Sequence, residues 1–405
     1  MYPVFPLILD GATGTELQKR GFSGPECTEQ WVLEHPEEFI SMQKEYVDAG
    51  SKIVYSPTFG GNRTKLEEHG IFSQTREYNK KLAGLSKQAA DGKAWVAGDI
   101  APTGLFLAPM GDTSFEELYE IYSEQVEGLL EAGVDLFVIE TMMTLPEARA
   151  AVLAVKAHCD KPVFCTFTCD ANGKTLSGTD VTAALVVMQG MGVDAFGLNC
   201  SVEPEDMLRQ ITRLREYAEV PLIAKPNAGM PKTIGGKTVY DLSPEELAGF
   251  MDEFAGQGVA IFGGCCGTHS GHISALNKKS ASVCPAEPAP EHTGLLPCAS
   301  EKRPCYLPAD IELGKTIRCS DDMADELEEA MENELPVICV SIETEDELEL
   351  FADCQYMIDC ALCFKCSDAA LLEKALRLYQ GRAMYEGTLS DEELLPLVIH
   401  YGLVI

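Results

Sequence analysis

The sequence predicts an α/β fold, a (β/α)8 TIM barrel followed by a smaller C-terminal α/β domain. From about residue 6 to residue 280, short apolar runs alternate with longer amphipathic segments eight times, which is the pattern of a barrel with eight strands. A doubly wound open sheet would give the same alternation, but the count of eight units favours the barrel. At 405 residues with 46% hydrophobic content, the chain is long enough for both domains.

The predicted barrel strands are short apolar runs, each followed by a polar or glycine-rich segment. They are Leu7–Asp10, Lys52–Ser56, Ala94–Asp99, Asp135–Glu140, Pro162–Thr168, Ala195–Asn199, Pro221–Ala224 and Val259–Phe262. Between them, Ser114 and Ser243 are placed to cap helices. Glycine follows several predicted helices, as at Gly50, Gly133 and Gly258, which fits a left-handed helix end.

Composition divides the chain into three segments. Residues 1–282 form the predicted barrel, residues 283–305 contain five prolines and are interpreted as a linker, and residues 306–405 form the small domain. About 100 residues cannot close a second eight-stranded barrel, which needs at least ~200. The elements expected there are helix Asp321–Asn333, strand Pro336–Ile342, helix Thr344–Ala352, strand Tyr356–Cys363, helix Ala369–Tyr379, strand Ala383–Tyr385 and helix Asp391–Tyr401.

Charge and composition argue against several classes of function. The net charge is −33, and nucleic-acid partners require basic surface. The segment from Tyr306 onward has 6 basic and 23 acidic residues, so the small domain is strongly acidic. No apolar run approaches the ~20 residues that span a bilayer, and we expect no membrane partner. The chain begins without signal-peptide features, so the sixteen cysteines are expected to be reduced thiols in the cytoplasm.

Two cysteine motifs that lie far apart in the sequence are interpreted as one metal site. They are Gly197–Cys200 (GLNC) and Gly263–Thr268 (GGCCGT), and each follows a predicted buried strand. Three thiolates at strand ends can hold Zn²⁺ and leave its fourth position open, as in catalytic zinc sites. The alternative is that these cysteines are small buried apolar residues. The flanking glycines favour the metal site, because adjacent cysteines reach one ion only where the chain leaves strand geometry.

Other polar side chains follow predicted strands at the same end of the barrel, where barrel active sites lie. Asp10 and Glu140 end apolar runs, and burying a carboxylate there is costly unless it meets a cation. A structural ion pair or a helix cap explains each of them equally well. The turn Gly11–Gly14 matches no phosphate-loop spacing, but its backbone N–H groups can hold a carboxylate. Segments that begin at Ser56, Asp99 and Lys225 complete this set.

Six segments together resemble the homocysteine S-methyltransferase family, and most of all the homocysteine-binding barrel of cobalamin-dependent methionine synthase. The resemblance extends over about residues 5–280, and the two cysteine motifs are its most specific part. The segments are Leu9–Thr15, Pro57–Arg63, Gly98–Gly104, Gly197–Ser201, Lys225–Gly229 and Gly263–Thr268.

The resemblance implies two sets of site residues. The zinc ligands and catalytic residues are Cys200, Cys265 and Cys266. The substrate-binding residues are Asp10 and Glu140, which match carboxylates that receive the homocysteine ammonium, Gly11 and Ala12, whose turn takes its carboxylate, and Asn199. His269, which follows the second cysteine motif, is interpreted as a surface residue or an indirect support of the site.

Zinc-bound thiol chemistry agrees with these assignments and needs no general base at the sulfur. A free thiol has a pKa of ~8.5 and is mostly protonated at neutral pH, whereas the thiolate is the nucleophile. Coordination to zinc deprotonates the thiol, and the sulfur then takes a methyl group by in-line displacement. We therefore expect a zinc-dependent homocysteine S-methyltransferase that forms methionine.

The methyl donor is expected to come from outside the chain. No cobalamin-binding Asp-x-His-x-x-Gly motif occurs in the sequence, so methylcobalamin would be supplied by a separate corrinoid protein. S-methylmethionine or betaine is the second candidate donor, and methyltetrahydrofolate is the third.

The C-terminal domain weakly resembles part of the pterin-binding barrel that follows the homocysteine barrel in methionine synthase. The likeness covers Leu362–Ser367 and Ala375–Ala383. Lys365 stands where that domain has an acidic residue, and Tyr385-Glu386 stands where it has asparagine. We therefore do not expect methyltetrahydrofolate to bind, and we interpret this segment as a docking or capping domain.

A group of cysteines in the same domain has two interpretations. Cys360, Cys363 and Cys366, with Cys354 upstream, have the spacing of an iron–sulfur or zinc ligand run. In a strand, however, Cys363 faces away from Cys360 and Cys366. The second interpretation, that these cysteines are ordinary buried residues, is the one we favour.

Two other functions fit the sequence. The chain can be a non-catalytic subunit that binds zinc and a thiol and recruits a partner through its acidic domain. Alternatively, the zinc is purely structural, which would require a fourth protein ligand such as Cys165 or Cys169 to close the coordination shell.

Overall fold

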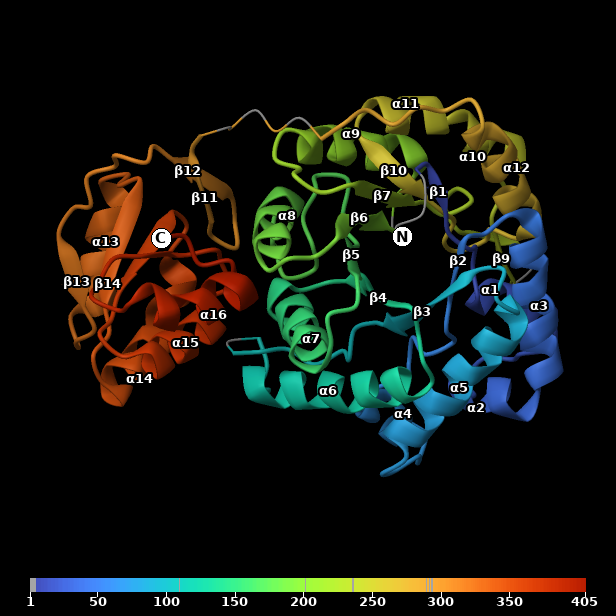
Figure 1. Ribbon diagram of the computed structural model, residues 1–405, viewed down its shortest axis with the longest axis horizontal. Helices are drawn as coiled ribbons and strands as arrows, with labels where there is room; N and C mark the ends of the chain where they lie inside the picture. The colour runs from blue at the N-terminus through green and yellow to red at the C-terminus, as the bar shows by residue number, and fades with distance from the viewer. Residues whose placement is uncertain are drawn as a thin grey trace.

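The computed structural model describes residues 5–108, 110–200, 202–234, 237–288, 290, 292 and 294–405. Two α/β units lie side by side in Figure 1, a large one coloured from blue to yellow and a small one in orange and red. The large unit is the (β/α)8 barrel that the sequence predicts, and the small one is the predicted C-terminal α/β domain. The fold class is thus confirmed.

Eight parallel strands form the barrel sheet in the order β1-β10-β7-β6-β5-β4-β3-β2 within the described residues. Between the two outermost strands, the backbone N–H of Lys52 donates to the carbonyl of Ile8 at 2.7 Å, which brings the sheet almost to closure. The strands are β1 (Leu7–Ile8), β2 (Ile53–Tyr55), β3 (Trp95–Ile100), β4 (Leu136–Met142), β5 (Val163–Phe167), β6 (Ala195–Asn199), β7 (Leu222–Lys225) and β10 (Val259–Phe262).

Helices surround this sheet (Figure 1). Several of them are followed by a glycine in the left-handed conformation, as the sequence predicts. The φ angles of Gly50, Gly133, Gly192 and Gly258 lie between +75° and +115°. The helices are α1 (Gly14–Lys19), α2 (Thr28–Glu34), α3 (Pro36–Ala49), α4 (Arg63–Glu68), α5 (Thr75–Ala90), α6 (Phe115–Glu131), α7 (Leu145–His158), α8 (Val181–Gly190), α9 (Pro204–Arg215), α10 (Pro244–Gly249), α11 (Met251–Gly256) and α12 (Ser270–Ser280).

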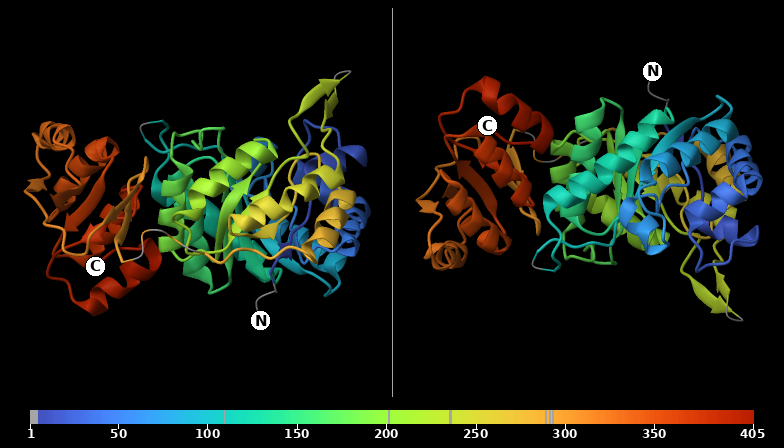
Figure 2. Two further views of the ribbon diagram at one scale, coloured as in Figure 1. Left: turned by 90° about the horizontal axis from the view of Figure 1, so that it is seen from above. Right: turned by 90° about the horizontal axis from the view of Figure 1, so that it is seen from below.

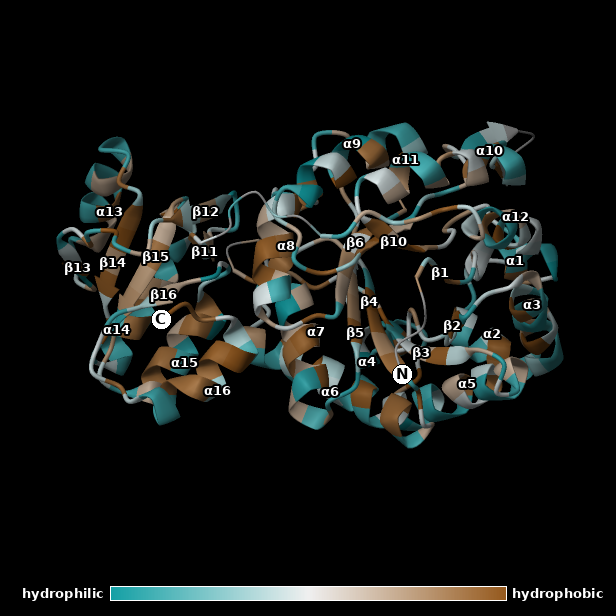
Figure 3. Cartoon of the chain, turned by 45° about the horizontal axis from the view of Figure 1, so that its top comes forward, coloured by the Kyte–Doolittle hydropathy of each residue, from teal (hydrophilic) through white to brown (hydrophobic). Residues whose placement is uncertain are grey.

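Along each strand, side chains point alternately into the interior of the barrel and outward against the helices. The interior cluster includes Leu7, Ile53, Val138 and Ile223, all fully buried, as expected for a barrel whose centre is a packed core. Hydrophobic colour is concentrated on the strands and on the helix faces toward them in Figure 3. Burial of this apolar surface is the main force that holds the barrel together.

An antiparallel hairpin interrupts the segment between β7 and α10. It consists of β8 (Lys232–Ile234) and β9 (Lys237–Val239). Figure 2 shows the hairpin extending away from the barrel. Tyr240 directly follows β9, so the hairpin sets where that side chain lies.

The C-terminal domain is a parallel sheet of four strands in sequential order, with helices on one face and a hairpin on the other. The sheet contains β13 (Thr316–Arg318), β14 (Val337–Ser341), β15 (Ala361–Lys365) and β16 (Met384–Tyr385), and the helices are α13 (Met323–Glu332), α14 (Glu345–Cys354), α15 (Ala369–Leu378) and α16 (Asp391–Tyr401). The hairpin consists of β11 (Leu296–Ala299) and β12 (Pro304–Leu307).

Several details of this domain differ from the sequence prediction. The strand expected at Tyr356–Cys363 begins only at Ala361, because Gln355–Met357 form a turn of 3-10 helix. Strand β13 was not predicted, and β11 lies inside the segment that was interpreted as a linker. The orientation of the cysteines agrees with the prediction, since Cys363 faces the hairpin whereas Cys360 and Cys366 pack on the opposite, helix side.

The C-terminal domain packs against the side of the barrel formed by α7 and α8. The fully buried guanidinium of Arg149 in α7 donates to the carbonyl of Leu376 at 2.5 Å and to Gln380 Oε1 at 2.8 Å. Gly402 approaches Gly190 so closely that a Cβ on Gly402 would contact the Gly190 backbone at 2.6 Å. None of the helices in the described part of the chain combines the length and apolar character needed to cross a membrane.

Candidate active site

Three cysteine thiols lie together at the carboxyl ends of two barrel strands. Cys200 directly follows β6, and Cys265 and Cys266 come shortly after β10. Only β7 separates these two strands in the sheet. The three Sγ atoms lie within 4.8 Å of one another, and those of Cys200 and Cys266 are 3.9 Å apart. The structure therefore brings together the cysteines that the sequence analysis assigned to one metal site.

An unusual backbone conformation directs Cys200 toward the other two thiols. Its φ is +62°, a left-handed conformation that is costly for residues with a side chain. Backbone hydrogen bonds hold it there, because the Cys200 N–H donates to the carbonyl of Lys225 at 3.2 Å and its carbonyl accepts from Val202 at 2.8 Å. Such strain is often found where a side chain must be fixed for function.

The loop after β7 holds the Cys265-Cys266 turn in place. The Cys265 N–H donates to the carbonyl of Pro226 at 2.9 Å, and the Ala228 N–H donates to the carbonyl of Cys266 at 2.9 Å. Gly264 is needed beside them because a Cβ there would overlap the side chain of Thr268. The motif after β7 therefore supports the cysteine motif after β10.

The thiol set suits a soft divalent cation such as zinc. Hydrogen bonding to Cys200 raises the pKa of the Cys266 thiol to about 11, and hydrogen bonds to Cys200 and Cys266 raise the pKa of Cys265. The raised pKa favours the protonated form of Cys265 and Cys266, and a metal would bind by displacing these protons. Cys200, Cys265 and Cys266 are the one group of three or more candidate metal ligands among the described residues. Cys165 and Cys169, which the sequence analysis considered as a fourth ligand, do not belong to this group. A three-thiol set leaves one tetrahedral position for a substrate.

A cavity of about 440 Å³ lies beside the thiols. Its volume is in the range of small-molecule sites, roughly 300–1,000 Å³. The lining residues come from the ends of seven barrel strands, from helix α1, and from β9 and the residue after it, and all of them belong to the barrel unit. The C-terminal domain packs elsewhere on the barrel and does not cap this cavity.

Lys225 is the basic residue of the cavity lining, and it faces the two carboxylates that the sequence analysis singled out. Its Nζ lies 3.4 Å from Asp10 Oδ1 and 3.5 Å from Glu140 Oε2. It also lies 3.6 Å from the centre of the Tyr55 ring, a cation–π contact. Burial by itself lowers the pKa of Lys225, but the acidic groups around it, Glu140 and Asp10 included, hold that pKa well above its usual value.

A third buried carboxyl group, that of Asp99, also lines the cavity. Asp99 is 4% exposed, and its Oδ1 has no hydrogen-bond partner in the described structure. Burial, and then the nearby Glu140 charge, raise the pKa of Asp99 well above its usual value. Burial likewise raises the pKa of Asp10 and Glu140, although Lys225 lowers both.

Residues 7–280 match the family described as homocysteine S-methyltransferase. The chain belongs to the homocysteine S-methyltransferase family. This confirms the resemblance that the sequence motifs indicated. The part of the chain that matches contains the whole barrel sheet, the three thiols and the cavity.

Comparisons with known proteins agree with this assignment. The methionine synthases of Mycobacterium tuberculosis and Mycobacterium leprae are 32% and 33% identical over 301 and 291 residues. They cover 68% and 66% of this chain, which spans about a quarter of the length of these curated relatives. The metallated form of the homocysteine methyltransferase MmuM from Escherichia coli aligns with a TM-score of 0.59 and 26% identity, over 68% of this chain and 96% of that chain. Its oxidised form gives a TM-score of 0.58 and 25% identity.

Asn199 is held by hydrogen bonds in a position beside Cys265. Its Oδ1 accepts hydrogen bonds from the Thr141 N–H and the Thr166 hydroxyl, both at 2.9 Å, which fixes the amide orientation. Its Nδ2 donates to the Thr141 hydroxyl at 2.7 Å and lies 3.9 Å from Cys265 Sγ. In this family member, Asn199 therefore contacts a candidate metal ligand, although the sequence analysis placed it among the substrate-binding residues.

Tyr240 belongs to the site and was not found by sequence reasoning. It lines the cavity, and its hydroxyl is hydrogen-bonded to Cys266. That hydrogen bond favours the thiolate, because it acts to lower the pKa of Cys266. Tyr240 has no sequence motif of its own, and only the path of hairpin β8–β9 brings it to the thiols.

The turn at Gly11 and Ala12 lines the cavity, but one of its donors is already used. The Ala12 N–H donates to Thr268 Oγ1 at 3.1 Å, and the Ala12 carbonyl accepts from the Tyr46 hydroxyl at 2.7 Å. A Cβ at position 11 would contact the Tyr46 ring at 2.8 Å. The turn is therefore held tightly, and the Ala12 N–H is not free to bind a substrate carboxylate.

His269 has a structural task. Its Nδ1 accepts from the Gly271 N–H at 3.1 Å, so His269 caps the N-terminus of α12. The His269 backbone N–H in turn donates to His272 Nδ1 at 3.3 Å. This agrees with the interpretation of His269 as a residue outside the catalytic set.

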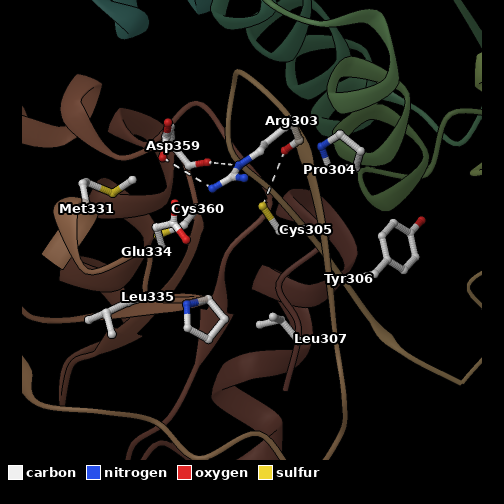
Figure 4. A pocket seen from close by; sticks show the side chains of 11 residues that line it. Arg303, Pro304, Cys305, Tyr306, Leu307, Met331, Glu334, Leu335, Asp359 and Cys360 are labelled. Carbon is white, nitrogen blue, oxygen red and sulfur yellow. Dashed lines mark hydrogen bonds and ion pairs between the residues drawn. The ribbon is translucent and has the colours of Figure 1, made fainter.

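A second, more open hollow of about 710 Å³ lies in the C-terminal domain (Figure 4). Its polar groups pair with one another: Arg303 Nε donates to the carbonyl of Asp359 at 2.7 Å, and Cys305 Sγ donates to the carbonyl of Arg303 at 3.7 Å. Its cysteines, Cys305 and Cys360, join no group of candidate metal ligands in the described residues. We therefore place the candidate active site in the barrel.

Proposed function

We propose that this chain catalyses zinc-dependent transfer of a methyl group to the thiol of homocysteine, with methionine as the product. The observation that supports it most is the meeting of three thiols beside a cavity that three buried carboxyl groups, those of Asp10, Asp99 and Glu140, also line. The thiols suit a metal that holds a sulfur substrate, and the carboxylates suit the ammonium of an amino acid. The membership of the chain in the homocysteine S-methyltransferase family points to the same substrate.

Each group of side chains has a separate task in this proposal. Cys200, Cys265 and Cys266 would hold zinc, which when bound supplies the substrate sulfur as a thiolate. Asn199 and Tyr240 donate toward Cys265 and Cys266 and keep these ligands in position. The carboxylates bind the amino acid end and orient the sulfur. The sulfur forms a bond to the methyl carbon, and the donor leaves with the electron pair of the bond that breaks.

We also propose that the methyl donor is a methylated corrinoid carried by a separate protein. The curated relatives are methionine synthases about four times as long as the matched segment, and no cobalamin motif occurs in this sequence. S-methylmethionine or betaine is the alternative donor. The alternative draws support from MmuM, a homocysteine methyltransferase of which 96% aligns with this chain.

The first test is methionine formation from homocysteine by the zinc-loaded protein with four donors in parallel. Free methylcobalamin, S-methylmethionine, betaine and methyltetrahydrofolate are each supplied, and a Cys265→Ala variant serves as the control. Turnover with methylcobalamin alone supports the corrinoid donor, and turnover with S-methylmethionine or betaine supports the alternative. Full activity of the variant would contradict the proposed function.

Two other outcomes separate the remaining candidates. Bound zinc with no turnover on any donor would favour a non-catalytic subunit that binds zinc and a thiol. X-ray absorption that shows four sulfur ligands without substrate would favour structural zinc. Three sulfur ligands that become four when homocysteine is added would support the catalytic proposal.

A further inference from the structure

The C-terminal domain contacts the active-site face of the barrel through the turn between β11 and β12, residues 300–303. This turn meets the loop between β5 and α8, residues 168–180, which follows the carboxyl end of a barrel strand. The Glu301 carboxylate accepts from the Thr179 hydroxyl at 2.7 Å, and the Glu301 carbonyl accepts from the Asp180 N–H at 3.3 Å. Strand β11 also contacts α8, which continues from this loop (Figure 1). The C-terminal domain therefore holds the β5–α8 loop from outside the barrel.

Glu301 is an acidic side chain that points toward hydroxyl groups of this loop. Its side chain is half-buried, and a carboxylate taken from water is costly unless hydrogen-bond donors or a cation face it. Burial raises the pKa of Glu301, whereas hydrogen bonds from Thr179 and Ser177 and the nearby charge of Arg149 act to lower it. The loop hydroxyls thus stabilise the Glu301 carboxylate, and the carboxylate in turn fixes the loop.

The β5–α8 loop forms one wall of a further hollow on the same face of the barrel, which we call the Val202 hollow. It has a volume of about 700 Å³, and its lining comes from the segments after β4, β5, β6 and β7. Val202 lines it, and the Val202 N–H donates to the carbonyl of Cys200 at 2.8 Å. Met143 also lines it, and the Met143 carbonyl accepts from the Ser177 N–H of the loop at 3.4 Å. The Val202 hollow therefore begins two residues from a candidate zinc ligand.

The Val202 hollow suits the second reactant of the methyl transfer. The thiols and carboxylates that suit homocysteine lie in the smaller cavity, whose lining in the described structure includes no residue of the β5–α8 loop. Leu176 and Met230 line the hollow and are 68% and 40% exposed, and exposed apolar groups that gather at one place mark binding surfaces. Methylated cations are held by aromatic faces, and no aromatic side chain is among the described residues that line this hollow. The lining therefore fits a large apolar donor such as a corrin ring.

We propose that Glu301 is a positioning residue for methyl transfer, through which the C-terminal domain holds the β5–α8 loop as a wall of the donor's binding site. The inference rests on the proposed function, because it assigns a place to the methyl donor of the same reaction. Homocysteine binds in the cavity, and the donor presents its methyl group to the sulfur from the Val202 hollow beside Cys200. The C-terminal domain thus acts on the reaction without a ligand of its own.

Two substitutions that remove the same hydrogen bond from opposite sides test this proposal. Glu301→Ala removes the acceptor and Thr179→Val removes the donor. We expect each to raise the KM for methylcobalamin by about tenfold, which is the size of one hydrogen bond to a charged group. The double variant should lose little more than either single variant, because the same interaction is absent in all three. Glu301→Gln keeps an oxygen that accepts from Thr179, and it should restore most of the loss.

Binding and proteolysis distinguish positioning from a general loss of structure. Calorimetry on the zinc-loaded protein should show weaker methylcobalamin binding by Glu301→Ala, with the dissociation constant of homocysteine within about twofold of the wild type. Trypsin should cleave after Lys174 of the loop faster in this variant, because the loop has lost a support. Glu392→Ala removes an exposed carboxylate of α16 and should change none of these values. Urea unfolding shows whether each variant is folded, and Thr179→Val gives the result if Glu301→Ala does not fold.

The possible outcomes separate this inference from the proposed function. Unchanged KM and binding of methylcobalamin in both single variants would overturn the inference, and so would an equal loss of affinity for homocysteine. A wild type that neither binds nor uses methylcobalamin would overturn it as well. In each of these cases, methionine formation from homocysteine with another donor would leave the zinc-dependent thiol chemistry standing. If the wild type does not bind homocysteine, the proposed function itself fails.

Discussion

Replacing Tyr240 with phenylalanine tests whether a hydroxyl outside the thiol set controls metal binding. The Tyr240 hydroxyl hydrogen-bonds to Cys266 and acts to lower the pKa of that thiol. It therefore stabilises the thiolate, which is the form that binds a metal. Phenylalanine keeps the ring in the cavity wall and removes only this hydrogen bond. The variant should leave the fold of the barrel unchanged.

The size of the effect follows from the kind of hydrogen bond that is lost. A hydrogen bond to a charged group contributes ~1.5–3 kcal/mol, and each 1.4 kcal/mol is a factor of about ten in affinity. Removing a residue that hydrogen-bonds to a metal ligand weakens metal affinity by roughly 10- to 100-fold. Because Tyr240 is half-buried, water can replace part of the bond, and we expect the lower end, about tenfold weaker zinc binding.

Competition with a chromogenic chelator at neutral pH measures this affinity. The matched control is Tyr306→Phe, since the Tyr306 hydroxyl is buried in the described structure without a hydrogen-bond partner. The control should bind zinc as tightly as the wild type. Equal zinc affinity for Tyr240→Phe and the wild type would refute the reasoning, because it would mean that the hairpin does not bring this hydroxyl to the thiolate.

Three further results are expected. Cys265→Ala should lose stoichiometric zinc, measured by atomic absorption, whereas Cys165→Ala within β5 should retain it, because only the first belongs to the thiol group. Burial raises the pKa of Asp99, so the folded state keeps a proton that the unfolded chain loses above pH ~3.9. The free energy of unfolding of the wild type therefore falls as the pH rises from ~4 through the raised pKa. Asp99→Asn should have a higher urea midpoint than the wild type at pH ~7, and it should have no such advantage below pH ~4. Arg149→Met leaves the Leu376 carbonyl and the Gln380 side-chain oxygen unpaired, which should lower stability by at least ~2 kcal/mol; an unchanged urea midpoint would contradict this.

The sequence predicts the barrel well because each unit repeats the same local signals. Gly133 and Gly258 end their helices at positive φ in corresponding places of two units, and the apolar runs between helices become strands. Boundaries in the small domain are less predictable. The apolar residues of Gln355–Met357 continue from α14 as a 3-10 turn, and a short apolar run does not by itself distinguish a strand from a helix end.

In the candidate site, too, some residues could be predicted from the sequence and others could not. The cysteines were found because their motifs stand at strand ends, where a barrel gathers its functional side chains. The position of Lys225 was not predictable, because its ammonium reaches Asp10 over 215 residues of sequence. Which carboxylate it meets depends on the strand order and on the length of the side chain. Tyr240 was missed for a related reason, since its place depends on the path of a hairpin.

The four-stranded sheet of the C-terminal domain is covered on both of its faces. Consecutive parallel strands with right-handed connections place their helices on one face, and the other face of this sheet carries the buried side chains of Val337, Cys339 and Cys363. In a closed barrel that face would be the interior. Here Cys298 and Leu307 of hairpin β11–β12 cover it. The helices on one face and the hairpin on the other thus bury the apolar side chains of all four strands, and the sheet needs no closure into a barrel to cover them.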